Sequence, residues 1–215
     1  MKMYNEGNYQ GALTHLASIL DVSKDMESGS SNYKIRFLAA HCHWKMKNYT
    51  NALAHLKRCS DIESSNVNPL IDIALILIDT NKYGEAETYG RKIITIDKNN
   101  SMGYYVLGLS KLKIGNYWGA KEFFEKSTSL DVEQYAAWNG LGKSLMLLNK
   151  YMEANTAFST ASALNPQSAE IYSNLAMSYY KLEKNKEAVM YINKALEIEP
   201  ENEILKNNQK QITGE

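Results

Sequence analysis

The chain has 215 residues, with 24 Lys and Arg balanced by 24 Asp and Glu, and this zero net charge argues against a nucleic-acid-binding protein, which needs a basic surface. Only 3 Pro and 12 Gly interrupt a composition rich in good helix formers, so we expect an all-helical protein. The N-terminus is polar, which argues against a secretory signal, and the longest apolar run, Ile73–Ile78, is too short to span a membrane. The chain has only two cysteines, Cys42 and Cys59, which argues against a disulfide framework.

The N-terminal segment 1–32 contains an incomplete repeat followed by a loop. Residues 1–20 are expected to form a partial helix pair, because little sequence precedes the turn in EGNYQGA. The step from Ala12 to Ala52 is longer than the later steps between equivalent alanines, and the excess falls in the polar, Ser- and Gly-rich segment 21–32. We expect this segment to be a loop and the chain to be the tail of a longer repeat array.

From Tyr33 onward the sequence repeats with a fixed period. Alanines of the turn signature recur in register at Ala52, Ala86, Ala120, Ala154 and Ala188, which defines a 34-residue repeat. The full units are 33–66, 67–100, 101–134, 135–168 and 169–202, and residues 203–215 are expected to form a capping helix. Each unit holds two blocks of apolar residues at three- and four-residue spacing, separated by turn residues, which predicts an antiparallel helix pair.

Unit 135–168 carries nearly the whole signature of one repeat family. Its W-x-x-L-G, Tyr, A-x-x-x-F and Pro elements are Trp138, Leu141, Gly142, Tyr151, Ala154, Phe158 and Pro166. In this pattern the chain resembles the tetratricopeptide repeat family over almost its whole length. The resemblance implies a single all-α domain over residues 1–215, a right-handed superhelical solenoid of antiparallel helix pairs. Departures such as Arg36 for an aromatic residue and Gly90 for a bulky one predict looser packing in the first two full units.

The stretch AWNGLGKS at residues 137–144 is one residue short of a phosphate-binding loop. In the 34-residue register Gly142 lies inside a helix, where its N–H is already bonded to a carbonyl four residues back. Gly140 and Gly142 are then about 200° apart around the helix and cannot form one cradle. We therefore interpret Gly142 as a packing residue and expect no nucleotide site.

The histidines and cysteines also invite a metal interpretation, which the register disfavours. His41 and His43 are expected to point to nearly opposite faces of one helix, while His55 and Cys59 supply two ligands at best. No catalytic set is discernible, and most acidic residues fall in turns and on outward faces. We expect no metal, no cofactor and no enzymatic activity.

The resemblance implies that the first helix of each unit lines a concave groove. The predicted groove residues are Phe37, His41, Trp44, Ile71, Leu75, Ile78, Tyr105, Leu109, Leu112, Asn139, Lys143, Met146, Met177 and Tyr180. The six apolar residues from Ile71 to Leu112 would form a contiguous patch large enough to suggest a binding site. The alternative is that the protein itself fills the groove, by an upstream segment or by self-association.

We expect a non-catalytic protein-interaction scaffold that docks an apolar or amphipathic segment of a partner protein, as a subunit of a multiprotein complex. No nucleic acid or membrane insertion is expected, and the location is intracellular, in the cytoplasm or in a cytoskeletal, ciliary or nuclear complex. A substrate-recruiting arm of a larger, glycosyltransferase-like enzyme and an assembly chaperone or adaptor remain as alternatives. An adaptor for the C-terminal tails of heat-shock chaperones is disfavoured, because Ile71, Leu75, Val106, Gly140 and Glu170 occupy positions where that family needs clamp residues.

Overall fold

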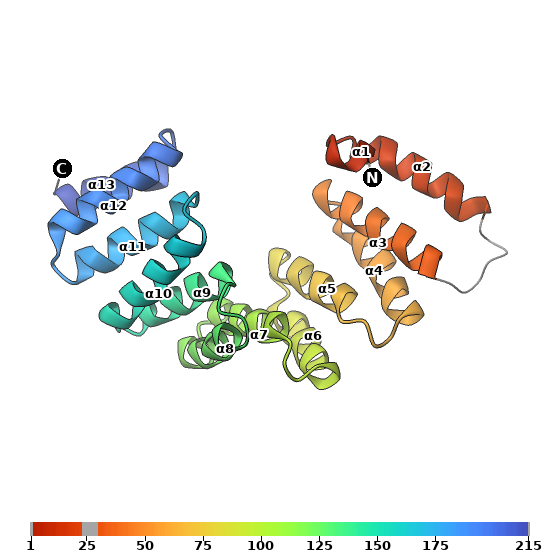
Figure 1. The fold of residues 1–215 in the computed structure, drawn as a ribbon, viewed down its shortest axis with the longest axis horizontal. Coiled ribbons are helices and arrows are strands. Elements are labelled where there is room, and N and C mark those ends of the chain that lie inside the picture. Colours follow the sequence, from red (N-terminus) through yellow and green to blue (C-terminus); the bar gives the residue numbers. More distant parts are fainter. Residues whose placement is uncertain (1, 23–29, 215) are drawn as a thin grey trace. The chain divides into compact units, whose positions relative to one another are not determined.

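The computed structural model describes residues 2–22 and 30–214, and these residues form α-helices and no strand (Figure 1). The helices are α1 (Lys2–Asn5), α2 (Tyr9–Val22), α3 (Ser30–Lys45), α4 (Tyr49–Ile62), α5 (Asn68–Asp79), α6 (Tyr83–Ile96), α7 (Ser101–Lys113), α8 (Tyr117–Leu130), α9 (Tyr135–Leu147), α10 (Tyr151–Leu164), α11 (Ala169–Lys181), α12 (Asn185–Ile198) and α13 (Glu203–Thr213). None of these described helices is both long and apolar enough to cross a bilayer. The expectation of an all-α protein is therefore confirmed.

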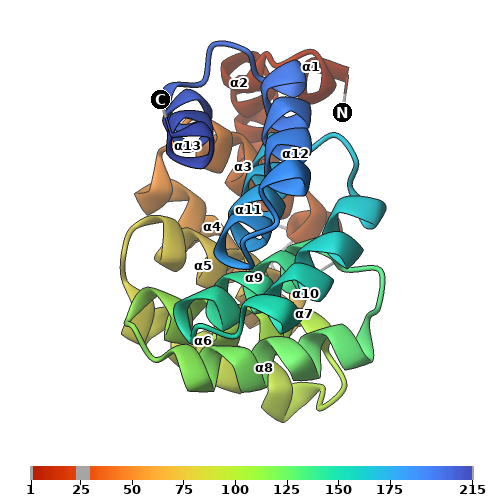
Figure 2. The same ribbon diagram turned by 90° about the vertical axis from the view of Figure 1, so that its left-hand side faces the viewer.

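The chain divides into two compact units, which are described separately. Unit 1 spans residues 1–98 and contains α1–α6, and unit 2 spans residues 99–215 and contains α7–α13. Inside each unit every helix packs against the next one in sequence, as the colours of Figures 1 and 2 allow the reader to follow. The predicted loop at 21–32 is too long at both ends, because residues 21–22 belong to α2 and residues 30–32 to α3; residues 23–29 lie outside the described residues.

A left-handed residue ends the first helix of every pair. The backbone φ angle is positive at Gly7, Lys47, Asn81, Gly115, Asn149 and Glu183, and the last five of these recur at the period of the repeat. At Glu183 the backbone N–H donates to the Tyr180 carbonyl at 3.0 Å, and the N–H of Lys184 donates to the Tyr179 carbonyl at 3.0 Å. These two bonds satisfy carbonyls that the helix end leaves without a partner, and they reverse the chain sharply.

Replacing Glu183 by glycine should stabilise the protein, because glycine adopts a φ of 60° without a Cβ clash. We expect the free energy of unfolding to rise by about 0.5–1 kcal/mol for Glu183→Gly and to fall by a similar amount for Gly115→Ala. Urea denaturation of both variants checks this. Equal midpoints for the parent and the two variants would show that the turn conformation contributes nothing to stability.

Small residues allow the helices of each pair to approach closely. The recurring alanines Ala52, Ala86, Ala120, Ala154 and Ala188 are all fully buried. A Cβ atom built on Gly142 would lie 2.5 Å from the buried ring of Phe158, and one built on Gly140 would lie 2.5 Å from Phe124. The two glycines of the P-loop-like stretch therefore each receive a phenylalanine ring, from α10 and α8 respectively. This confirms the packing role predicted for Gly142 and shows that Gly140 has the same role.

The sign of the Gly142→Ala effect separates packing from helix propensity. Propensity alone predicts a gain of about 1 kcal/mol. We expect a loss of about 1–3 kcal/mol instead, because the added methyl group has no space beside Phe158. Gly84→Ala in α6 is the matched control, since no atom lies within 4 Å of its added Cβ, and it should be neutral or stabilising. If both variants gain stability in thermal and urea melts, the predicted contact at Phe158 does not exist.

Candidate functional site

Four rings follow one face of α3 in unit 1, and we call them the aromatic row. Tyr33, Phe37, His41 and Trp44 are spaced four, four and three residues apart, so they lie above one another on the helix. Their ring centroids are 5.5 Å apart for Tyr33 and Phe37, 4.6 Å for Phe37 and His41, and 6.3 Å for His41 and Trp44. The row thus joins the three predicted groove residues of α3, which are half-buried, to Tyr33, which is only 8% exposed and belongs largely to the core.

Two adjoining hollows lie along the aromatic row. The first has a volume of about 540 Å³ and is lined by Tyr33, Phe37 and His41 together with apolar residues of α2 and α3. The second, of about 470 Å³, is lined by His41 and Trp44 and by charged residues that include Asp72. Tyr4 of α1 and His41 line both hollows. Both volumes fall within the range of ligand sites.

Two carboxylates of α5 contact the last two rings of the row, His41 and Trp44. The His41 Nε2 atom lies 2.7 Å from the Asp72 Oδ2 atom, and the Trp44 Nε1–H donates to Asp79 Oδ2 at 3.3 Å. Asp72 and Asp79 are seven residues apart, so they lie on one face of α5, two helical turns from each other. Each polar ring edge is therefore held by an acid, while the ring faces remain in the hollows.

The predicted groove residues of α5 differ in their exposure. Ile71 and Leu75 are half-buried, but Ile78 is only 8% exposed and belongs to the apolar core of unit 1. Ile78 therefore offers little surface to a partner; Ile73, Ala74, Ile76 and Leu77 are buried as well, so α5 is covered on more than one face. The repeat register alone could not give the number of faces that neighbouring helices cover.

In unit 2 the apolar groove positions also support the core. Tyr105, Leu109, Leu112 and Met146 are half-buried and pack against the buried cluster around Phe124 and Phe158. Met177 and Tyr180 pack in the same way against the cluster around Ala188 and Ile192. Replacing such residues would therefore disturb stability as well as any bound partner, which makes them poor positions for testing recognition alone.

The remaining groove positions of unit 2 form a polar network across α9 and α11. Lys143 forms an ion pair with Glu170, and Asn139 donates a hydrogen bond to the same carboxylate at 3.4 Å. Asn174 donates to the Asn139 side-chain oxygen at 2.9 Å. Burial acts to raise the pKa of Glu170, but the hydrogen bond and charge of Lys143 outweigh it, so the pKa is lowered and the carboxylate stays ionised.

The contacts of Lys143 and Ser144 show that the P-loop-like stretch does not form a phosphate site. Lys143 lies within α9 and directs its ammonium group to Glu170, and the Ser144 hydroxyl donates to the Gly140 carbonyl at 2.9 Å. A phosphate cradle requires backbone N–H groups that are unbonded at the start of a helix. These residues are interior to α9, so the interpretation of the stretch as helix packing is confirmed.

His41 and His43 face different helices, as the register predicts. His41 contacts Asp72 of α5, whereas His43 stacks on His55 of α4 with ring centroids 5.5 Å apart. In the part of the chain that the structure describes, no group of three or more potential metal ligands comes together. Cys59 is buried, and burial raises the pKa of its thiol to about 12, so it remains a packed, protonated group.

The stacked histidine pair makes the stability of the protein depend on pH. Burial lowers the pKa of His43 and of His55, and for His55 the charges of His43 and Arg36 lower it further. The unfolded chain, with an ordinary histidine pKa of about 6.5, then binds more protons than the folded chain at mildly acidic pH. The contribution of the two histidines to the free energy of unfolding therefore has its full value above about pH 6.5. It is lost as the pH falls below about 6.5 toward the lowered pKa values of the folded chain.

Replacing both rings by phenylalanine should flatten this acid dependence, because the stacked geometry is kept and the protons are removed. Urea denaturation of His43→Phe with His55→Phe, at neutral and mildly acidic pH, measures the difference from the parent. His15→Phe is the control, since His15 is exposed on α2. An unchanged pH slope in the double variant would contradict the assignment of two neutral imidazoles.

Four family models match parts of the chain. Models of the tetratricopeptide repeat match residues 169–202 and 103–131, and a TPR repeat model matches residues 142–183. The model described as anaphase-promoting complex, cyclosome, subunit 3, matches residues 5–93. The chain belongs to the tetratricopeptide repeat family. No curated protein matches its sequence.

Solved structures show the same fold at low sequence identity. A chain of the APC/C hetero-tetramer Cut9–Hcn1 has a TM-score of 0.82 and 15% identity, and the match covers 98% of this chain but 40% of that one. The protein MamA has a TM-score of 0.62 and 20% identity, covering 80% of this chain and 94% of that one. YrrB, titled a TPR protein with an unusual peptide-binding site, has a TM-score of 0.62 and 19% identity, covering 82% and 91%. These likenesses establish the fold alone.

Proposed function

We propose that the protein is a non-catalytic scaffold that binds an extended apolar segment of a partner protein along the aromatic row of unit 1. The observation that carries the proposal is the continuous row of Tyr33, Phe37, His41 and Trp44 beside hollows of about 540 and 470 Å³. Membership of a repeat family with a peptide-binding relative, YrrB, supports a protein or peptide ligand.

The spacing of the rings favours an extended ligand. Successive rings four residues apart on a helix are separated by about 6 Å along its axis. Alternate side chains of an extended chain are separated by about 6.6 Å, so every second side chain of such a segment can meet one ring. Aromatic faces bind apolar and aromatic side chains with large buried area and defined geometry.

The carboxylates add a polar requirement at one end. Asp72 and Asp79 lie beside His41 and Trp44, and the side chain of Asp79 is on the exposed part of α5. A partner segment with a backbone N–H or a basic side chain at that end would satisfy these acids, and a cation would also meet the face of Trp44. Lys45 and Lys47 line the same hollow, so we propose an apolar segment with polar groups but no preferred sign of charge at the Trp44 end.

The test is a selection of random displayed peptides on the immobilised full chain, followed by calorimetry of the recovered peptides. Phe37→Ala with Trp44→Ala should weaken binding roughly tenfold or more, because each buried aromatic side chain contributes about 1.5–3 kcal/mol. The matched control exchanges charges on the exposed face of α8, Glu122→Lys with Lys126→Glu, and should bind as the parent does. Thermal melts confirm that both variants fold.

Two outcomes would reject the proposal. If recovered peptides bind the Phe37 and Trp44 variant as tightly as the parent, recognition lies outside the aromatic row. If selection yields only highly acidic peptides with few apolar residues, the chemistry of the site has been misread.

A further inference from the structure

Unit 2 has two edges of opposite charge, one at each end of its helix pairs. The turns inside the pairs are residues 113–118, 147–152 and 181–186, and the loops between pairs are 130–135, 164–169 and 198–203. Helices of 13 and 14 residues separate turns from loops by about 20 Å. We call the turns the basic edge and the loops the acidic edge, for the reasons given next.

The charges on the two edges are nearly complementary. The basic edge carries five lysines and one glutamate: Lys113, Lys150, Lys181, Lys184, Lys186 and Glu183. The acidic edge carries five acids and no Lys or Arg: Asp131, Glu133, Glu199, Glu201 and Glu203. Three of these charges are already engaged in ion pairs with neighbours outside the edge, Lys150 with Glu153 at 2.9 Å, and Glu201 and Glu203 with Lys206 at 3.1 Å each.

Each edge also exposes large apolar side chains among its charges. On the basic edge Ile114, Trp118, Leu147 and Met152 are 51–71% exposed. On the acidic edge Val132, Tyr135 and Leu164, together with the adjoining Ile204, are 38–70% exposed. The Lys150 Nζ atom lies 5.5 Å from the Trp118 ring centroid, which places two successive turns in contact and their apolar residues on one surface.

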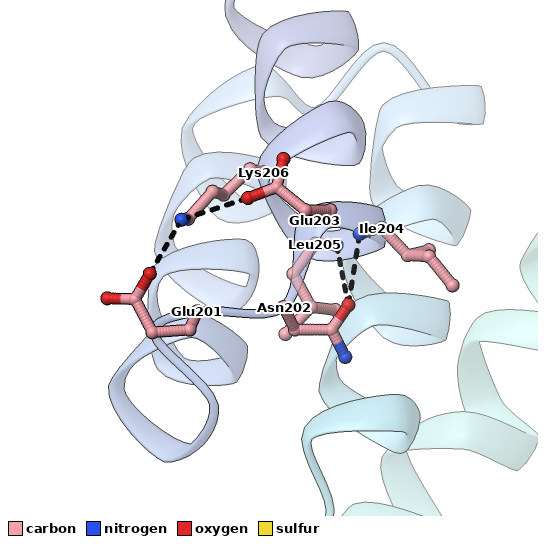
Figure 3. A network of polar contacts seen from close by, with 6 residues as sticks. All are labelled: Glu201, Asn202, Glu203, Ile204, Leu205 and Lys206. Atoms are coloured by element: carbon pink, nitrogen blue, oxygen red, sulfur yellow. Dashed lines mark hydrogen bonds and ion pairs between the residues drawn. The ribbon is translucent and has the colours of Figure 1, made fainter.

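The acidic edge is organised by its last loop, shown in Figure 3. The Asn202 side chain accepts hydrogen bonds from the backbone N–H groups of Ile204 and Leu205 and so begins α13. Lys206 bridges Glu201 and Glu203 on one side of the helix, whereas the Ile204 side chain extends from the other side (Figure 3). The exposed Ile204 side chain and the two carboxylates bridged by Lys206 thus lie on different sides of the start of α13.

We propose that these edges bind each other between two copies of this chain, the basic edge of one copy against the acidic edge of the next. Pairing of like edges is disfavoured, because each edge keeps an excess of one sign of charge after its local ion pairs, and these like charges would face each other. Unlike edges place opposite charges together and bury four apolar side chains from each side. Such head-to-tail contact is heterologous and leaves one edge of each type open at the ends, so it builds chains or closed rings rather than a simple dimer.

The interface is small, so association should be weak and salt-dependent. Eight apolar side chains and about ten charges fall short of a standard stable interface. The charge contribution should fade between about 0.1 M and 1 M salt, as the screening length falls from about 10 Å to about 3 Å. Sedimentation velocity of the full chain over roughly 10–500 μM should therefore show a sedimentation coefficient that rises with concentration, and rises less at high salt.

Edge variants supply the decisive experiment. Trp118→Glu with Met152→Glu disables the basic edge, and Val132→Lys with Ile204→Lys disables the acidic edge; all four positions are exposed, so both proteins should fold. Each variant alone should self-associate at least roughly tenfold more weakly than the parent. Mixed together they should form a one-to-one heterodimer and nothing larger, because each retains the edge that the other lacks. Met190→Glu, an exposed apolar position of α12 outside both edges, is the control and should behave as the parent.

The possible results separate this proposal from its rivals. Recovery of a heterodimer on mixing supports head-to-tail pairing. A parent that stays monomeric over the whole range overturns it and leaves the edges to other partners. A parent that dimerises while the two variants fail to complement each other, or a dimer lost only on mutation of the aromatic row, also overturns it and assigns self-association to a different surface.

Discussion

The close approach of neighbouring helices at small residues is the constraint on which the rest of the structure depends. The recurring alanine of each full repeat, from Ala52 to Ala188, is fully buried, and Gly140 and Gly142 accept the rings of Phe124 and Phe158 from opposite sides of α9. These contacts occupy the positions of each first helix that face neighbouring helices, so the remaining positions are left for a second role. The aromatic row and the polar network on Glu170 occupy those remaining positions.

The left-handed residue at the end of each first helix determines which side chains gather at the turn edge of unit 2. It reverses the chain within a few residues, so the turn is short and its side chains project outward at nearly the same place in every pair. Residues that follow or precede it, such as Lys113, Lys150 and Lys184, are then collected on one edge. A charge pattern that looks scattered along the sequence becomes a single basic surface through the period of the repeat.

The fold was predictable because periodicity is a property of the sequence itself. The helix pairs and the packing role of Gly142 followed from the 34-residue register, whereas the packing role of Gly140 against Phe124 was not predicted. The ends of the loop at 21–32 did not, since its polar residues extend the flanking helices by a few positions. Boundaries of this kind depend on capping and on neighbouring helices, which composition does not report. The candidate site was only partly predictable: Phe37, His41 and Trp44 were found from their column positions, but Tyr33 and Asp72 were missed.

These misses have physical causes. Tyr33 is almost buried and joins the row through its stacking on Phe37, and Asp72 reaches the row through its contact with His41 of another helix. Neither contact can be read from the register of a single repeat. Ile78 is buried in the core of unit 1, whereas the residues at its equivalent positions, Leu112, Met146 and Tyr180, are half-buried. A repeat register predicts the direction in which a side chain points from its own helix. Whether that side chain is buried or exposed depends on the helices that pack beside it.

The two proposed surfaces differ in the physical basis of their selectivity. The aromatic row offers ring faces in hollows that are also lined by a few charged side chains, so its discrimination rests mainly on shape and buried apolar area. The edges of unit 2 offer like charges around exposed apolar side chains, so their discrimination rests on the rejection of like charge. A partner that binds the aromatic row need carry no net charge. A partner that binds one edge of unit 2 must carry a charge opposite to that of the edge. Since the whole chain is neutral while its unit 2 edges are not, a second copy meets the second requirement without any other molecule.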